Sequence, residues 1–536
     1  MKRDETTNWT ADDDRKVEDA IRRGATRRDL LRMLMSGGVA AVAGSSILGA
    51  ASRAVAATPS RGGFIVVSGS SSSTADTLDP AKATNTTDYC RVCAVFNRLT
   101  VLDGAGFPQM ELAESLESDD AKTWTVKLRK GVTFHSGKSL TPADVVYSLN
   151  RHLDESVGSK VNAIAKQIES VIAVDNETAR IVLERPNADL PVILALFHFM
   201  IVEDGTTDFS KPSGTGSFKV EKFEPGVNSI MVRNENYFKD GPYLDGFEFI
   251  AITDANARLN ALLSGDVHLI NAVLPQSMRL VEQSPGVTPL ISTSGNYSNL
   301  NMRLDMSPGD KAGFVEGMKY LLDREQIQRS VFRNLAVVAN DQPVSPASKY
   351  HNAELKPREF DPERAKQLFE KAGVLGQSIP MICSPSAPGS VEMATLLQQA
   401  GSKIGLEIDV QRVPQDGYWS NYWLKSAVHF GNINPRPTPD ILFSLLYAKT
   451  AKWNESQYMS DKFDSMLLEA RGSLDEAKRV EIYGDMQTMI SNEAGTAIPA
   501  WISNVDVASS KLKGFETNPL GNMMGYNFAE SVWLEQ

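Results

Sequence analysis

The sequence contains few cysteines and histidines for its length. Its 536 residues include three cysteines and six histidines. Three cysteines are too few for the disulfide framework of a small secreted scaffold. The histidines have no spacing typical of metal ligands, and no HExxH motif occurs; they stand at positions 135, 152, 198, 268, 351 and 429. We therefore expect neither a metal site nor a disulfide scaffold.

The motifs of several common enzyme chemistries are also missing. The chain has no GxxxxGK[ST] phosphate loop and no GxSxG nucleophile elbow. Gly214-Thr215-Gly216 begins like a dinucleotide loop, but Lys219 stands where the third glycine belongs. A net charge of -11 argues against nucleic acid, whose phosphates attract clustered Lys and Arg. These absences favour a protein with no cofactor and no catalytic site.

The N-terminal segment, residues 1–57, has the organisation of an export signal. Arg27-Arg28 precedes two leucines, Met33–Ser52 carries no charge, and small residues up to Ala57 suit a signal peptidase. A paired arginine before a weakly hydrophobic core is typical of twin-arginine signals. We expect the twin-arginine translocase to export the chain to the periplasm, with cleavage after Ala56 or Ala57. A membrane anchor is the alternative, disfavoured by the many Gly and Ser residues.

Removal of this segment changes how charge and cysteines are interpreted. The mature chain has 45 basic and 58 acidic residues, a net charge of -13. Cys90 and Cys93 form a lone CxxC within a segment of helical apolar spacing, and Cys383 is far away. This context favours buried structural thiols. A disulfide and a redox role remain alternatives in an oxidising compartment.

Strand and helix signals alternate along the mature chain. Trp124–Leu128 alternates apolar and polar residues as a half-buried strand does. Thr141-Pro142-Ala143-Asp144 and Asp361-Pro362-Glu363-Arg364 are typical helix starts. Further helices are predicted from Asp254 to Gly265 and over residues 474–495, and Val267–Ile270 is predicted to be a strand. Mixed segments without long linkers predict an α/β fold of closely packed lobes.

Several short motifs resemble one family when they are taken in order. The segments are Thr77–Pro80, Phe134–Leu149, Gly214–Val220, Arg233–Phe238, Leu244–Gly246, Ala261–Asp266, Leu322–Arg324 and Phe360–Lys366. Together they resemble the extracellular solute-binding proteins of the dipeptide, oligopeptide and nickel group, which serve ABC importers. The resemblance spans essentially the whole mature chain.

The resemblance implies a two-lobed periplasmic-binding-protein fold with an additional family-specific subdomain, hinged around a ligand cleft. Lobe I would comprise residues 58–81, 205–297 and 503–536, the extra subdomain residues 82–204, and lobe II residues 298–502. Hinge strands would cross near Asn296–Met302 and Trp501–Val507. Closure over the solute would present the receptor, which we expect to be a monomer, to its cognate permease in the inner membrane.

The aromatic segment from Tyr418 to Trp423 is the first candidate for the solute site. Four of its six residues are aromatic, Tyr418, Trp419, Tyr422 and Trp423, and the resemblance places this neighbourhood beside the ligand. The spacing equally fits one buried helical face, so core packing is the alternative. Tyr297, beside the predicted hinge, is a further candidate.

The loop around Arg436 departs from the family's pattern. In peptide-binding relatives an aspartate there pairs with the peptide's amino terminus, but this chain has Pro435 at that position and Asn432 at the aromatic position. Arg436 offers a planar fork suited to a carboxylate or phosphate, so we hypothesise an acidic solute held by Arg436 with Asn432 and Asn434 nearby. An exposed Arg436, or one paired with Asp440, is the alternative.

The sequence as a whole predicts the substrate-binding component of an ABC importer. Its solute would be a peptide or a peptide-sized polar organic molecule, captured in the periplasm by closure of the lobes. An exported enzyme, either cofactor-containing or hydrolytic, is the alternative, since twin-arginine cargo often folds around a cofactor before export.

Overall fold

The computed structural model describes residues 59–104 and 106–535. The predicted export signal, residues 1–57, lies outside the described residues. Within the described part of the chain, no helix is long and apolar enough to cross a membrane.

Short sequence signals set the ends of two predicted helices. The Asp361 side chain accepts a hydrogen bond from a first-turn N–H of α12 (Pro362–Ala372). Gly373 ends that helix with a φ of 67°, which glycine adopts without strain. Asp254 caps α8 (Ala255–Ser264) in the same way. Both predicted helices are confirmed.

Two further predicted helices are also present. Thr141 and Asp144 exchange hydrogen bonds as a capping box at the start of α5 (Pro142–Asn150). The helix expected over residues 474–495 is α17 (Glu476–Glu493). The strand predicted at Val267–Ile270 is shorter than expected, because only β11 (Leu269–Ile270) pairs with neighbouring strands.

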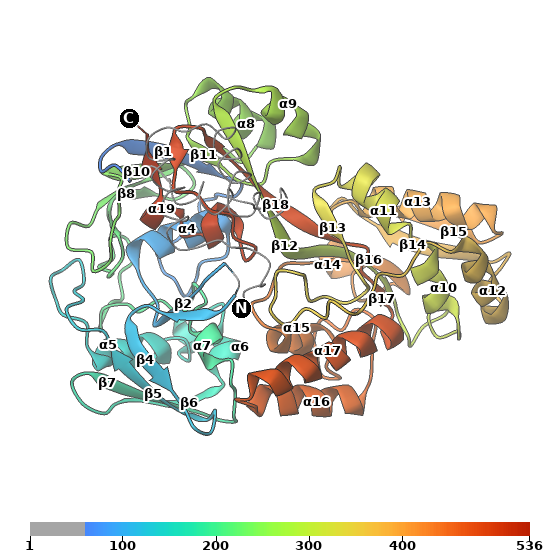
Figure 1. Cartoon of the computed structure of the whole chain (residues 1–536), viewed down its shortest axis with the longest axis horizontal. Helices are drawn as coiled ribbons and strands as arrows, with labels where there is room; N and C mark the ends of the chain where they lie inside the picture. The colour runs from blue at the N-terminus through green and yellow to red at the C-terminus, as the bar shows by residue number, and fades with distance from the viewer. Residues whose placement is uncertain (1–58, 105, 536) are drawn as a thin grey trace, which may run out of the picture. The chain divides into compact units, whose positions relative to one another are not determined.

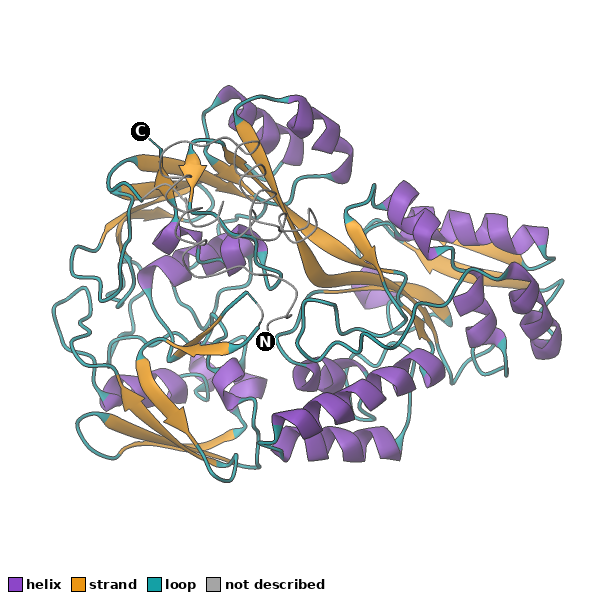
Figure 2. Cartoon of the chain, viewed as in Figure 1, coloured by secondary structure: helices purple, strands orange, loops and turns teal. Residues whose placement is uncertain are grey.

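One twelve-stranded sheet runs through the unit formed by residues 61–536 (Figure 2). Its main order is β15-β14-β16-β12-β18-β11-β1-β10-β9-β8, with β13 paired to β18 and β17 to β12. The bounds not yet given are β1 (Phe64–Gly69), β8 (Phe218–Glu224), β9 (Asn228–Arg233), β10 (Gly246–Ala251), β12 (Val287–Met302), β13 (Ala336–Val338), β14 (Ser378–Cys383), β15 (Glu407–Arg412), β16 (Val428–Ile433), β17 (Thr496–Ala497) and β18 (Ala500–Ser509). Parallel and antiparallel pairs both occur, which with the helices confirms the α/β class.

Strands β12 and β18 are shared by the two halves of this sheet (Figure 1). They pair antiparallel, with a register shift between Ser292 and Asn296. Leu290 packs against the core beside β1 and β10, whereas Leu300 is buried in the core beside β14 and β16. The predicted hinge segments lie in these two strands. The limits of the predicted domains stay predictions.

The half of the sheet containing β1 has its own helices and cores. Phe247 and Phe249 pack against α4 and the C-terminal segment. The remaining elements here are α4 (Thr86–Val95), η2 (Pro275–Ser277), α9 (Met278–Gln283), β19 (Leu512–Lys513), α18 (Asn522–Gly525), α19 (Phe528–Ser531) and β20 (Trp533–Leu534). Cys90 and Cys93 lie buried in α4, and Cys383 is buried in β14; all three are free thiols, which confirms the favoured interpretation.

A separate four-stranded sheet, ordered β4-β5-β7-β6, forms the core of the segment predicted as the extra subdomain. Trp124 and Ile181 are buried there, where β5 and β7 pair. The elements are β2 (Thr100–Leu102), β3 (Pro108–Met110), β4 (Ala113–Glu117), β5 (Thr123–Leu128), η1 (Glu155–Val157), α6 (Asn162–Ala165), β6 (Ile168–Ala173), β7 (Thr178–Leu183) and α7 (Leu190–Ile193). The predicted strand at Trp124–Leu128 is confirmed as part of β5.

The other half of the main sheet is covered by most of the long helices. One core lies against β14–β16, and a second surrounds Phe443 and Tyr483. The remaining elements are α10 (Phe314–Leu321), α11 (Arg324–Gln326), η3 (Ile327–Val331), α13 (Ser390–Lys403), α14 (Tyr418–Asn421), α15 (Pro439–Leu446) and α16 (Asp461–Gly472).

Candidate functional site

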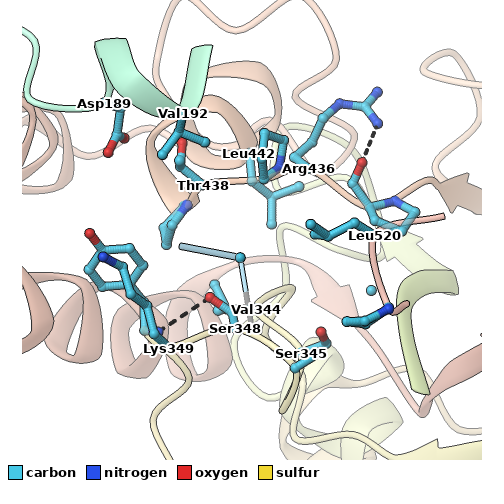
Figure 3. A pocket seen from close by; sticks show the side chains of 18 of the residues that line it. Asp189, Val192, Val344, Ser345, Ser348, Lys349, Arg436, Thr438, Leu442 and Leu520 are labelled. Atoms are coloured by element: carbon cyan, nitrogen blue, oxygen red, sulfur yellow. Dashed lines mark hydrogen bonds between the residues drawn. The ribbon is translucent and has the colours of Figure 1, made fainter. Parts of the chain in front are cut away.

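A cavity of about 180 Å³ lies where segments distant in the sequence meet. Its walls come from residues 188–192 beside α7, residues 343–350, the loop before α15, the start of α17, and Pro519-Leu520 (Figure 3). The segment predicted as the extra subdomain therefore supplies one wall, and the segment predicted as lobe II supplies most of the others.

The loop before α15 is stiffened by its own sequence. Pro435, Pro437 and Pro439 fix three φ angles within five residues. Thr438 then accepts a hydrogen bond from the N–H of Ile441 at 3.3 Å and caps α15. The loop consequently holds Arg436 in place between two prolines at the cavity wall (Figure 3).

One side of the cavity carries four charged groups that neutralise one another. Asp189 forms an ion pair with Arg479, and both side chains are buried. Lys349 Nζ lies 2.6 Å from Glu476 Oε1. The Tyr350 hydroxyl donates to Glu476 Oε2 at 3.1 Å, and its ring lies under the Arg479 guanidinium. This side of the cavity is therefore polar but electrically balanced.

Arg436 is the lining charge without an opposite partner. Among the described residues no carboxylate pairs with it, and its hydrogen bonds run only from Nη1 to the carbonyl oxygens of Asn434 and Pro435, both at 3.0 Å. Burial lowers the pKa of the guanidinium, opposed by the nearby hydroxyls of Tyr297, Tyr89 and Tyr526. The Nε and Nη2 donors are left for another acceptor.

Asp440, the alternative partner for Arg436, is engaged elsewhere. Its Oδ1 lies 2.9 Å from Arg471 Nε. Burial raises the pKa of Asp440 to about 6, although Arg471 lowers it. The carbonyl oxygen of Arg471 in turn accepts from the N–H of Ala188 at 2.8 Å, and Ile441 packs against the core of the four-stranded sheet. These contacts join the two sides of the cavity and leave Arg436 unpaired.

The predicted aromatic contacts lie away from this cavity. Tyr418 is fully buried, and its hydroxyl donates to the Phe430 carbonyl oxygen at 2.5 Å. Trp419 is 41% exposed and meets the Trp423 ring edge-on, with centroids 5.5 Å apart. Trp423 Nε1 donates to Glu455 at 2.6 Å. A solute-binding role for these three aromatics stays a prediction.

The other predicted residues surround Arg436 without lining the cavity themselves. Tyr297 is completely buried in the core beside α15. Asn432 Nδ2 donates at 3.0 Å to the Tyr297 carbonyl oxygen and to Asn296, which ties β16 to β12. Asn434 is exposed and meets Arg436 through its carbonyl oxygen. Of the seven predicted site residues, the structure brings Arg436 alone to the cavity wall.

Four charged lining residues were not found from the sequence. Asp189 stands before Leu190-Pro191 and reads as an ordinary helix cap. Lys349 follows a polar loop, and Glu476 and Arg479 read as solvent-facing positions of an amphipathic helix. No local signal marks them, because they meet only through packing of segments far apart in the chain.

The described residues contain no group of three or more His, Cys, Asp or Glu side chains that could hold a metal ion. The lining also lacks a paired nucleophile and base. Two halves that share a pair of long strands, with a cavity lined by apolar and charged side chains beside them, define a receptor for a small solute.

Comparison with known proteins identifies the receptor class. Residues 108–454 match the family described as bacterial extracellular solute-binding proteins, family 5 Middle. The chain belongs to this family, whose members bind solutes for ABC importers. This confirms the two-lobed fold and the solute-binding role that the sequence motifs predicted.

Individual relatives are distant but nearly full-length. Heme-binding protein A of Haemophilus influenzae is 27% identical over 80% of this chain and 85% of its own. The dipeptide-binding protein of Escherichia coli is 25% identical over 76% of this chain and 84% of its own. The structure of HbpA2 from Haemophilus parasuis superposes with a TM-score of 0.79 at 21% identity, covering 88% of this chain and all of that one.

Proposed function

We propose that this protein captures a short peptide or similarly small organic solute bearing an acidic group, and hands it to an ABC permease. Membership of the solute-binding family supports the receptor role. A dipeptide-binding relative supports a peptide-like solute. The receptor binds its solute without chemical change and acts as a monomer.

The proposal that the solute is acidic rests on one observation, the lack of a carboxylate partner for Arg436 among the residues that the structure describes. A charged lining residue with free donors offers a charge-assisted hydrogen bond to a carboxylate or phosphate. Such a bond contributes about 1.5–3 kcal/mol, which corresponds to about ten- to a hundredfold in affinity. The other lining charges already have partners, so the acid group of the solute meets Arg436.

The volume of the cavity supports a small solute. Its 180 Å³ is below the range of about 300–1,000 Å³ typical of pockets for drug-sized ligands. A dipeptide or an amino-acid conjugate suits this space better than a molecule as large as haem, the ligand in the name of one relative.

A thermal-shift screen tests the proposal. Matched solutes that carry either a free carboxylate or its amide are added to the purified mature protein, for example peptides and their C-terminal amides. The acid forms raise the melting temperature by mass action, and the amides do so far less. Equal stabilisation by acid and amide would contradict the claim that Arg436 binds an acidic group of the solute.

We further propose that the twin-arginine translocase delivers the protein to the periplasm. The paired arginine in residues 27–28 supports this route. Replacement of Arg27-Arg28 by two lysines should leave the precursor in the cytoplasm. Normal export of this variant would argue for a different route.

A further inference from the structure

Asp189, a residue of the cavity lining, has a buried carboxylate oxygen with no hydrogen-bond partner in the described part of the chain. It occupies the N-cap position of α7, yet its side chain caps nothing. The residue is 1% exposed and lines the cavity, where it extends from α7 (Figure 3). One carboxylate oxygen, Oδ1, binds Arg479, whereas Oδ2 has no hydrogen-bond partner among the described residues. A buried carboxylate oxygen in this state calls for a hydrogen-bond donor.

The charges that line the cavity limit which donor fits. Lys349 and Arg479 balance Glu476 and Asp189 on one side, and Arg436 adds one positive charge on the other. The lining therefore has a net charge of +1. A solute of charge -1 neutralises it, whereas a zwitterion leaves one positive charge in a buried site. An ammonium group at Asp189 would also lie near the cations of Arg479 and Lys349.

We infer that the solute is a monoanion whose acidic group meets Arg436 and whose other end carries an uncharged O–H or N–H that donates to Asp189 Oδ2. This inference rests on the proposed function, because it takes the acid at Arg436 as given. The class it selects is that of amino acids acylated by a hydroxy acid, and similar hydroxy acids. Free dipeptides, which are zwitterions at neutral pH, are disfavoured.

Three probes with one skeleton isolate the group that faces Asp189. N-propionyl-alanine has no donor there, N-lactoyl-alanine has a hydroxyl, and alanyl-alanine has an ammonium. Calorimetric titration of the mature protein should give N-lactoyl-alanine the highest affinity, about tenfold above N-propionyl-alanine. Binding of alanyl-alanine as tight as that of N-lactoyl-alanine would overturn the inference. So would equal affinity for the lactoyl and propionyl probes, the result expected if water already satisfies Oδ2.

Variants test whether Asp189 is the acceptor. Asp189→Asn keeps the shape but makes the hydrogen bond neutral, so the lactoyl-over-propionyl preference should fall about fivefold. Asp76→Asn is the matched control, since Asp76 is also buried and paired with an arginine but does not line the cavity. It should leave the preference unchanged. A preference that survives in Asp189→Asn would place the donor elsewhere.

The two proposals fail in different ways. If Arg436→Gln leaves the affinity for N-lactoyl-alanine unchanged, the acidic group does not bind Arg436 and the proposed selection of an acidic solute is wrong. If that variant weakens binding but alanyl-alanine is the preferred probe, Arg436 does bind the acidic group, and the inference of a monoanionic solute is wrong.

Discussion

Replacement of Asp506 by asparagine should make the protein less sensitive to rising pH. Asp506 lies in β18 and accepts hydrogen bonds from the Met523 N–H at 2.6 Å and from Asn522 Nδ2 at 2.9 Å. No cation pairs with it among the described residues, and burial raises its pKa to about 7 despite these two donors. It also holds a strained segment, since Met523 and Met524 have φ angles of 51° and 59°.

The size of the effect follows from the two pKa values of Asp506. In the unfolded chain the carboxyl keeps its ordinary pKa of 3.8, so between pH 4 and pH 7 the folded state binds more protons than the unfolded state. The free energy of unfolding therefore falls as pH rises through this window. Linkage gives a loss of about 2–3 kcal/mol between pH 5 and pH 8. Asparagine does not titrate, so Asp506→Asn escapes this loss.

Urea unfolding of both proteins at pH 5 and pH 8 measures the difference. Other buried carboxyls with a raised pKa, such as Asp88 and Glu455, are common to both proteins and cancel. The asparagine oxygen can accept from Met523, and the Asn522 amide can turn to accept from the new amide group. The advantage of Asp506→Asn should grow by about 2–3 kcal/mol from pH 5 to pH 8, whereas Asp416→Asn, at an exposed position, should show no such change. An advantage independent of pH would refute the reasoning.

Two other substitutions probe the segment predicted as lobe II. Asp341→Asn should lower the free energy of unfolding by about 3–5 kcal/mol, because it leaves the buried Arg324 and the partly buried Arg358 without their shared carboxylate; equal urea midpoints would contradict this. Trp423→Phe should cost about 1.5–3 kcal/mol in the same assay, since the buried Glu455 loses its indole donor. Trp423→Phe should leave solute affinity unchanged, because the indole lies away from the cavity. A large loss of affinity would instead indicate that Trp423 contacts the solute.

Local sequence signals predicted the helix ends well. A capping side chain, a proline at the first helical position and a terminating glycine act within a few residues, so Asp361-Pro362 and Gly373 define α12 without help from the rest of the fold. The cysteine interpretation succeeded for a similar reason, because apolar helical spacing around Cys90 and Cys93 already indicated burial.

The cavity was much harder to predict. Asp189 and Arg479 are 290 positions apart, and neither stands in a motif. The aromatic segment around Trp419 was conspicuous in the sequence, but the structure uses Tyr418 for packing and leaves Trp419 at the surface. Arg436 reached the cavity wall because the alternating prolines around it constrain the loop locally. The type of a residue therefore predicted its place at the cavity only for Arg436, where the local sequence also restricts the backbone.

The most direct test of the central claim is a calorimetric titration of the solute that gives the largest thermal shift. Wild type, Arg436→Gln and Arg412→Gln are compared, the last at an exposed position outside the cavity lining. Loss of the charge-assisted bond should weaken binding about ten- to a hundredfold in Arg436→Gln and leave Arg412→Gln like the wild type. Equal affinities in all three proteins would contradict the claim that this receptor holds an acidic solute through Arg436.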